Sequence, residues 1–145
     1  MIINSIHITV FAGLSGRDIG FEQGMNVVLG PNETGKSTIF RALENTLFTP
    51  AGLTPSRFQR LMGHYLPIGG GDTIEAMIHF SHSGEPYDLQ RSWGATAFSK
   101  LTLPGGAVIT DDEKIQLEIE SCIQVPEGTC KNVMMTYQSG LTQTL

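Results

Sequence analysis

The chain has 145 residues, which is the size of one domain with its own hydrophobic core. Its formal net charge is −5 and it contains no lysine–arginine cluster. Surfaces that bind duplex nucleic acid neutralise its phosphates, so this segment is not expected to be the main surface of that kind. No apolar run approaches the roughly 20 residues of a membrane span, and no basic segment of a signal peptide opens the sequence. We therefore expect a cytoplasmic protein without a membrane partner, with Cys122 and Cys130 as free thiols.

The first 50 residues predict strands that lead into a glycine-rich loop and then into a helix. Residues 2–10 are apolar and β-branched, residues 19–21 form a short apolar run, and residues 25–29 form a stronger one. Each of these runs predicts a strand. Residues 37–47 have apolar side chains at helical spacing and predict the helix.

The middle of the chain predicts a linker followed by two hairpins. Residues 49–71 are rich in proline and glycine, with one short helix expected at 56–62 behind a Thr54 or Ser56 cap. Alternating apolar residues predict a strand at 73–80, and residues 87–93 its partner across a turn at 81–84. Residues 100–103 and 108–109, on either side of the turn Pro104-Gly105-Gly106, predict a second hairpin.

A second long helix is predicted to start near residue 110. Thr110 and Glu113 have the spacing of a capping box. The apolar face that follows consists of Ile115, Ile119, Cys122 and Ile123. Pro126 ends this helix, and residues 132–137 are the last strand candidate.

The sequence GPNETGKST, residues 30–38, satisfies the full pattern of a phosphate-binding loop. Its glycines permit a backbone path that a Cβ would block, and successive N–H groups then form a nest for an anion. Lys36 is predicted to reach the β- and γ-phosphates, Ser37 to ligate Mg²⁺, and Thr38 to lie near the α-phosphate. The predicted nucleotide-binding residues are Gly30, Pro31, Asn32, Glu33, Thr34, Gly35, Lys36, Ser37 and Thr38.

The pattern Phe21-x2-Gly24-x-Asn26, followed by GPNETGKST, resembles the amino-terminal lobe of the SMC/RecF/SbcC-type P-loop ATPases. These include the double-strand-break repair branch and YhaN-like proteins. The resemblance implies ATP and Mg²⁺ as cofactors and an α/β fold of the P-loop NTPase class. That fold is an ABC-ATPase-like lobe with a mixed sheet, a helix after the phosphate loop and an antiparallel β subdomain.

The resemblance also implies a Q-loop, whose glutamine senses Mg²⁺ and the γ-phosphate. Gln138 stands at the expected place, so Lys36 and Gln138 are the implied catalytic residues, and Ser37 and Gln138 the implied Mg²⁺ ligands. The alternative for Gln138 is a polar residue in a strand-to-helix turn. Family members often carry an arginine near the end of the first strand; here Arg17 either replaces it or is an exposed turn residue.

A complete hydrolytic site also needs a Walker B aspartate for Mg²⁺ and a carboxylate that orients water, and we find neither in the sequence. The run Val108-Ile109-Thr110-Asp111-Asp112-Glu113 superficially resembles a Walker B strand, but only two apolar residues precede its carboxylates. We expect a helix cap there instead. In the resembled family, the signature motif, the Walker B strand and the switch histidine belong to a C-terminal lobe.

We therefore expect a single nucleotide-binding lobe over residues 1–145 that is a fragment of a longer ATPase. Its parts are a phosphate-loop part (1–48), a linker and helix (49–71), a β-rich subdomain (72–110), and a helix with the Q-loop (111–145). The chain alone is expected to bind ATP without efficient turnover.

The resemblance implies a role in DNA repair or chromosome maintenance, with hydrolysis only when the C-terminal lobe joins a homodimer of heads. DNA as a partner rests on the resemblance alone. Two alternatives stay open. A stand-alone P-loop kinase or GTPase should show an arginine-rich lid or the DxxG and NKxD motifs, which the sequence lacks. A non-catalytic nucleotide-binding regulatory module is the other alternative.

His79 and His82 have a spacing that suggests a metal pair. On a strand, however, residues three apart point to opposite faces, so we expect no metal site between them.

Overall fold

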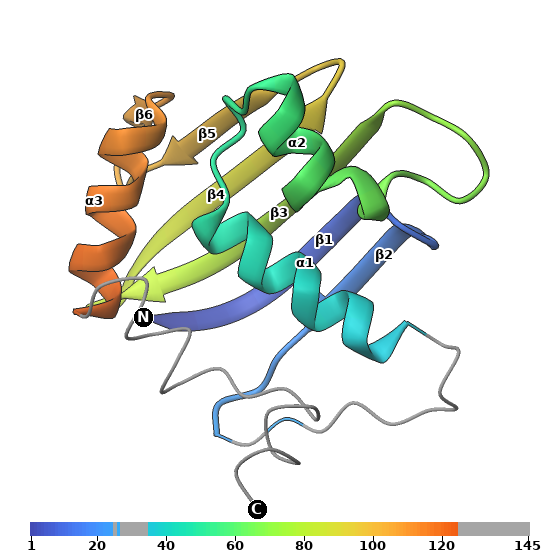
Figure 1. Ribbon diagram of the computed structural model, residues 1–145. Coiled ribbons are helices and arrows are strands. Elements are labelled where there is room, and N and C mark those ends of the chain that lie inside the picture. The colour runs from blue at the N-terminus through green and yellow to red at the C-terminus, as the bar shows by residue number, and fades with distance from the viewer. Residues whose placement is uncertain (25, 27–34, 125–145) are drawn as a thin grey trace, which may run out of the picture.

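The computed structural model describes residues 1–24, 26 and 35–124 of the chain. Its strands form one six-stranded sheet in the order β2-β1-β3-β4-β5-β6 (Figure 1). The strands are Ile2–Phe11 (β1), Leu14–Gly20 (β2), Thr73–His82 (β3), Glu85–Gly94 (β4), Phe98–Thr102 (β5) and Val108–Ile109 (β6). The helices are Lys36–Phe48 (α1), Pro55–Leu61 (α2) and Asp112–Ile123 (α3), and a short 3-10 helix, Gly63–Tyr65 (η1), follows α2. The expected α/β class is confirmed.

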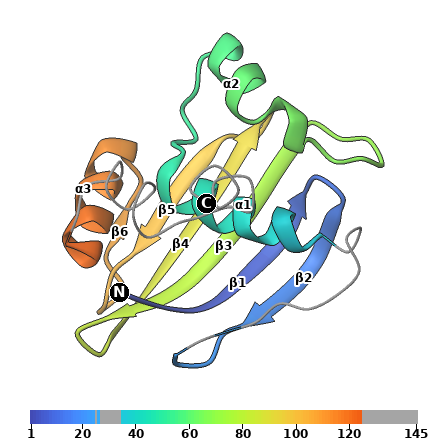
Figure 2. The same cartoon turned by 60° about the horizontal axis from the view of Figure 1, so that its bottom comes forward.

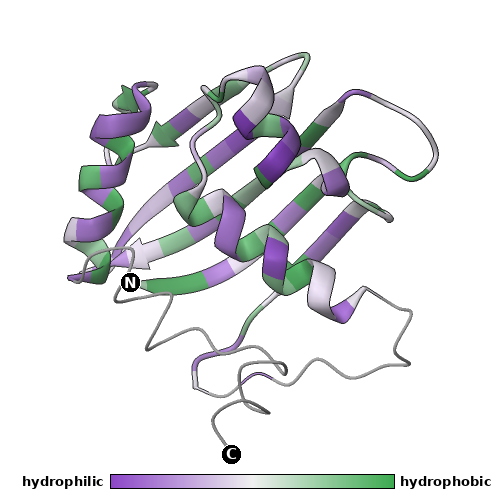
Figure 3. Cartoon of the chain, in the orientation of Figure 1, coloured by the Kyte–Doolittle hydropathy of each residue, from purple (hydrophilic) through white to green (hydrophobic). Residues whose placement is uncertain are grey.

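The helices cover one face of the sheet. α1 and α2 lie over this face and α3 lies beside β5 and β6, as the two views show (Figures 1 and 2). On β3, Ile74, Ala76, Ile78 and Phe80 are buried while the residues between them are half-exposed. The same alternation of apolar and polar residues is visible along the strands in Figure 3. A strand that reads this way has one face in the core and one face in water.

Every strand pairing in the described part of the chain is antiparallel. We expected a mixed sheet, so the observed sheet differs in this respect. β1 pairs with β2 on one side and with β3 on the other. The strands before the phosphate loop and the later hairpins therefore share one sheet and one core.

β2 is longer and starts earlier than the sequence predicts. We expected a strand only at 19–21, but β2 runs over Leu14–Gly20 and pairs with β1. Its residues are polar or glycine at most positions, so the sequence gives no strand signal; pairing with the long apolar β1 makes it a strand. Arg17 is exposed, but it lies on β2 opposite Ile8 and not in a turn.

The helix starts are set by caps that the sequence located to within one residue. Thr54 caps α2 by accepting a hydrogen bond from the Arg57 N–H at 3.4 Å. On α3 the cap is Asp111, which accepts from the Lys114 N–H at 3.0 Å, and not Thr110 as the capping box predicted. The expectation that this acidic run is a helix start and not a buried strand is confirmed.

Asp112 has a contact role that its sequence position does not reveal. Its carboxylate accepts hydrogen bonds from the Gly52 N–H at 3.1 Å, the Ala51 N–H at 3.4 Å and the Ser99 hydroxyl at 2.5 Å. It thereby joins the start of α3 to β5 and to the loop that follows α1.

The apolar face expected on α3 is buried, apart from the half-buried Ile123. Ile115, Ile119 and Cys122 are buried on α3, and Cys122 is a free thiol. None of the described helices is long and apolar enough to cross a membrane. The predicted strands at 25–29 and 132–137, together with Cys130, lie outside the described residues, apart from Asn26.

Candidate functional site

The candidate site is centred on the amino-terminal end of α1. Gly35 is the residue that caps this helix, and the Ile39 N–H donates to its carbonyl oxygen at 2.9 Å. Lys36 and Thr38 are half-buried and Ser37 is exposed. The first turn contains no acidic side chain that would compete for the amide donors. Such a helix end favours an anion through its unpaired N–H groups and its dipole.

Gly35 is required at its position for two reasons. Its φ of 84° and ψ of 18° place it in the left-handed region, which other residues rarely adopt. A Cβ at this position would stand 2.8 Å from Cδ2 of Leu14 at the start of β2. The glycine therefore lets the end of the phosphate loop pass close to the β1–β2 hairpin.

Asn26 explains part of the motif that precedes the loop. Its side-chain oxygen accepts from the Glu22 N–H at 2.8 Å, and its amide nitrogen donates to the Glu22 carbonyl at 2.7 Å. A further, longer bond reaches the Gly24 carbonyl at 3.3 Å. The Phe21 N–H donates to the Asn4 carbonyl of β1 at 2.8 Å. Asn26 thus closes the turn through which the chain leaves β2 toward the phosphate loop.

The other end of α1 is fixed by β4. The Thr49 carbonyl, one residue past the helix, accepts from the Arg91 guanidinium at 2.7 Å and from the Trp93 indole at 3.2 Å. Both donors are buried. The sequence did not reveal this contact, because nothing in the local pattern around residue 91 marks an arginine that points into the core.

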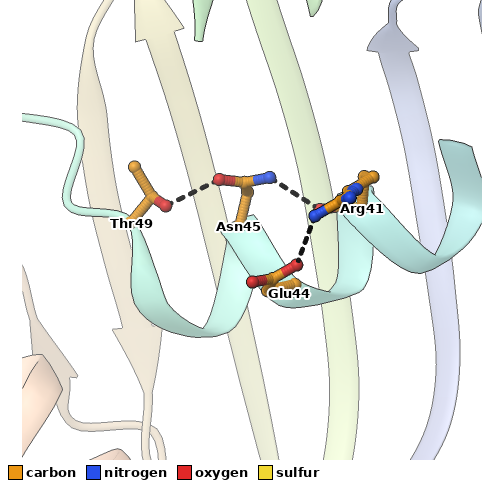
Figure 4. A network of polar contacts seen from close by, with 4 residues as sticks. All are labelled: Arg41, Glu44, Asn45 and Thr49. Carbon is orange, nitrogen blue, oxygen red and sulfur yellow. Dashed lines mark hydrogen bonds and ion pairs between the residues drawn. The ribbon is translucent and has the colours of Figure 1, made fainter. Parts of the chain in front are cut away.

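Side-chain bonds continue this support along α1 (Figure 4). The Asn45 amide donates to the Arg41 carbonyl at 2.8 Å, and its oxygen accepts from the Thr49 hydroxyl at 2.7 Å. Arg41 and Glu44 form an ion pair at 3.4 Å. Burial raises the pKa of Tyr65, a nearby residue on η1; Arg41 opposes this effect and Glu44 adds to it. These bonds fix the C-terminal half of α1, at the end away from its first turn.

The structure places only part of the predicted site. Gly35, Lys36, Ser37 and Thr38 come together at the start of α1. Gly30, Pro31, Asn32, Glu33, Thr34 and Gln138 lie outside the described residues, so their predicted roles stay predictions. No group of three or more His, Cys, Asp or Glu side chains in the described part of the chain could hold a metal ion.

Comparison with known proteins fits this geometry. A family model described as an AAA domain matches residues 5–138. The chain belongs to the AAA domain family. Relatives of this AAA domain include the DNA double-strand break repair Rad50 ATPase of Methanococcus maripaludis. It is 26% identical over 139 residues, which are 95% of this chain and 13% of that protein.

Two further relatives carry the same description. The Rad50 ATPase of Nanoarchaeum equitans is 29% identical over 87 residues, or 60% of this chain, and that of Thermoplasma acidophilum is 28% identical over 92 residues, or 63%. In each case the AAA domain chain covers 10% of the relative. It therefore spans only a small part of the length of the proteins it matches.

A solved structure shares the fold of this AAA domain. It comes from a study of ATP-driven dimerization and DNA-stimulated activation of SMC ATPases. The TM-score is 0.72 at 17% identity, with 99% of this chain and 90% of that chain covered. The expected resemblance to SMC/Rad50-type ATPases and the P-loop NTPase fold are confirmed.

Proposed function

We propose that this chain is the ATP-binding amino-terminal lobe of an SMC/Rad50-type ATPase that serves DNA repair or chromosome maintenance. The observation that carries the proposal is the junction at the start of α1. There a left-handed glycine is followed directly by Lys36 and Ser37, on a helix braced at its far end by Arg91 and Trp93. The family match and the names of the relatives support ATP as the nucleotide and DNA as the context.

In this proposal each group at the start of α1 makes its own contact with the phosphates or with Mg²⁺. The backbone N–H groups of residues 30–38, except at Pro31, which has none, would surround the phosphate chain, and the positive end of the α1 dipole would face it. Lys36 neutralises charge on the β- and γ-phosphates. Ser37 and Gln138 would hold Mg²⁺, which takes oxygen ligands and supplies charge stabilisation during phosphoryl transfer.

Turnover is proposed only for a larger assembly. Phosphoryl transfer also needs a carboxylate for the metal and a group that orients water, and these are the proposed contribution of a C-terminal lobe. A second head would cover the bound ATP across a two-fold interface. Cytoplasmic location and association with DNA are parts of the same proposal.

The test is calorimetric titration of ATP and GTP, with and without Mg²⁺, into the 145-residue chain. We expect ATP to bind, the Lys36→Ala variant to lose at least tenfold in affinity, and Ser37→Ala to lose the increment due to Mg²⁺. Lys100→Ala, which removes an exposed lysine on β5, is the matched control and should bind as the wild type does. Absence of ATP binding, or a preference for GTP, would contradict the proposal.

A further inference from the structure

Two histidine–aspartate pairs lie on the face of the sheet that the described helices leave uncovered. His7 Nδ1 on β1 lies 2.6 Å from Asp18 Oδ1 on β2, directly across the strand pair. His79 Nδ1 on β3 makes the same contact with Asp88 Oδ1 on β4, again directly across. Residues 7 and 79 alternate with the buried residues of their strands, so both pairs lie on the outer face.

The strand register brings the two histidines close together. His7 is directly opposite Met77, and His79 is directly opposite Ser5, in a stretch of the β1–β3 ladder without a register shift. Met77 is half-exposed and lies on the same face, two residues before His79. Residues directly opposite have Cβ atoms about 4.5–5.5 Å apart, and diagonal neighbours about 7–8 Å. His7, Met77 and His79 therefore form a triangle of neighbouring side chains.

Each aspartate holds one nitrogen of its histidine ring. In the order β2-β1-β3-β4, Asp18 lies on the outer side of His7, and Asp88 on the outer side of His79. In each pair Nδ1 is the ring nitrogen that contacts the carboxylate, so Nε2 is the nitrogen that the aspartate does not occupy. A carboxylate on one ring nitrogen is also the arrangement that fixes the tautomer of a metal-binding histidine.

We propose that His7, Met77 and His79 form a surface site for a soft transition-metal ion, with Cu(I) as the best match. Two imidazole nitrogens and one thioether sulfur are donors that Cu(I) accepts, and the thioether disfavours hard cations. Asp18 and Asp88 act as positioning residues. No group of three or more His, Cys, Asp or Glu side chains among the described residues could hold a metal ion by itself, so the Met77 thioether is the third donor of the proposed site. The proposal is independent of nucleotide binding.

The chain supplies matched controls for this site. It has four histidines. His64 is exposed on η1 beside Tyr65. His82 ends β3 three residues after His79, so it belongs to the other face of the strand. Neither belongs to the triangle. Cys122 is buried, and a Cys130→Ser background removes the other thiol as a competing ligand.

The experiment is an anaerobic titration of Cu(I) against a coloured chelator, in the Cys130→Ser background without an affinity tag. We expect one Cu(I) per chain. His7→Gln and His79→Gln should each weaken binding at least tenfold, and Asp18→Asn and Asp88→Asn should weaken it about 10–100-fold. Met77→Leu should weaken Cu(I) at least tenfold while changing Zn²⁺ affinity less than twofold. His64→Gln and His82→Gln should leave the Cu(I) affinity unchanged.

A second measurement on the Cys130→Ser protein does not depend on how these variants fold. In two-dimensional NMR, Cu(I) should shift the ring signals of His7 and His79 and the methyl signal of Met77, and leave those of His64 and His82 in place. The site is refuted if Cu(I) fails to compete with the chelator, if the double variant His7→Gln/His79→Gln binds as before, or if Met77→Leu has no effect. Shifts at His64 or His82 in place of the triangle would refute it as well.

Discussion

At the scale of single residues, two glycines hold positions that another residue would occupy only with strain. Gly94 ends β4 with a φ of 104°, and a Cβ there would stand 2.1 Å from the Asp72 carbonyl oxygen. The obstacle is backbone, which cannot turn aside as a side chain can. The same carbonyl accepts the Ala95 N–H at 3.0 Å, so the close approach is part of the turn. Gly35 meets a side chain, Leu14, in addition to its own left-handed backbone.

We expect Gly94→Ala to reduce the free energy of unfolding by about 3 kcal/mol or more, because it combines a strained φ with a backbone clash. Urea denaturation followed by circular dichroism measures this. Gly105→Ala is the control, because its φ is 90° but nothing lies within 4 Å of the added Cβ. It should cost only about 1 kcal/mol. Equal losses in the two variants would show that the Asp72 contact is unimportant.

Gly35→Ala is expected to affect both stability and nucleotide binding. The left-handed backbone and the contact with Leu14 should cost about 1–3 kcal/mol, and the first turn of α1 should shift, lowering ATP affinity at least tenfold. Denaturation and calorimetry together test this. Gly20→Ala, where no atom lies within 4 Å and φ is not positive, should leave both quantities nearly unchanged.

The Cys122 thiol predicts a pH dependence of stability. Burial raises its pKa above the ordinary value of 9.0, an effect that a hydrogen bond from Tyr87 opposes. An acid whose pKa is raised by folding stabilises the fold below its unfolded pKa, and this contribution is lost as the pH rises through the folded value. We expect the free energy of unfolding to fall from about pH 9 upward. In Cys122→Ala this fall should be smaller in urea titrations, and what remains near pH 10 comes from Tyr65 and Tyr87, whose pKa values burial also raises.

At the scale of elements, the far end of α1 is fixed by contacts with β4 and α3. The Thr49 carbonyl is bonded to two buried side chains of β4, and the next residues are bonded to Asp112 of α3. Because the helix is fixed in place, the N–H groups at its start are positioned before an anion arrives, and this arrangement suits an anion site.

Asp112 should therefore matter more than its acidic neighbour. Asp112→Ala leaves the Gly52 N–H and the Ser99 hydroxyl without their acceptor, and we expect a loss of about 2 kcal/mol in the free energy of unfolding. Glu113→Ala, an exposed change in the same helix turn, should stay within about 0.5 kcal/mol. Chemical denaturation of both variants tests whether the hydrogen bonds that join Asp112 of α3 to β5 and to the loop after α1 contribute to stability.

At the scale of the whole molecule, one antiparallel sheet joins the strands before the phosphate loop to the hairpins after it. The helices cover one face, with the start of α1 at the β1–β2 hairpin and its end over β4 (Figures 1 and 2). The described part of the chain thus shares one sheet, with the proposed nucleotide site at the start of α1.

We expect this body to bind ATP without forming a dimer, because closure of the nucleotide between two heads is proposed to need a C-terminal lobe. Light scattering of the chain with ATP and Mg²⁺ should give the monomer mass at concentrations well above the dissociation constant for ATP. A mass that doubles on addition of ATP would contradict this division of labour between the lobes.

The sequence by itself determined the elements whose signals are local. The phosphate-loop pattern, the helical spacing of α1, the alternation of β3 and β4, and the helix start at 111–112 are each set by neighbours along the chain, and the structure confirms those that it describes. The family resemblance also rested on a contiguous motif and was confirmed.

Only the tertiary structure decided the contacts between distant segments. β2 became a strand because β1 lies beside it, and the cross-strand register put His7 next to Met77 and His79. Arg91 and Asp112 found their partners more than forty residues away in sequence. Local propensity is too weak to fix such pairings; they follow from which faces the whole chain must bury together.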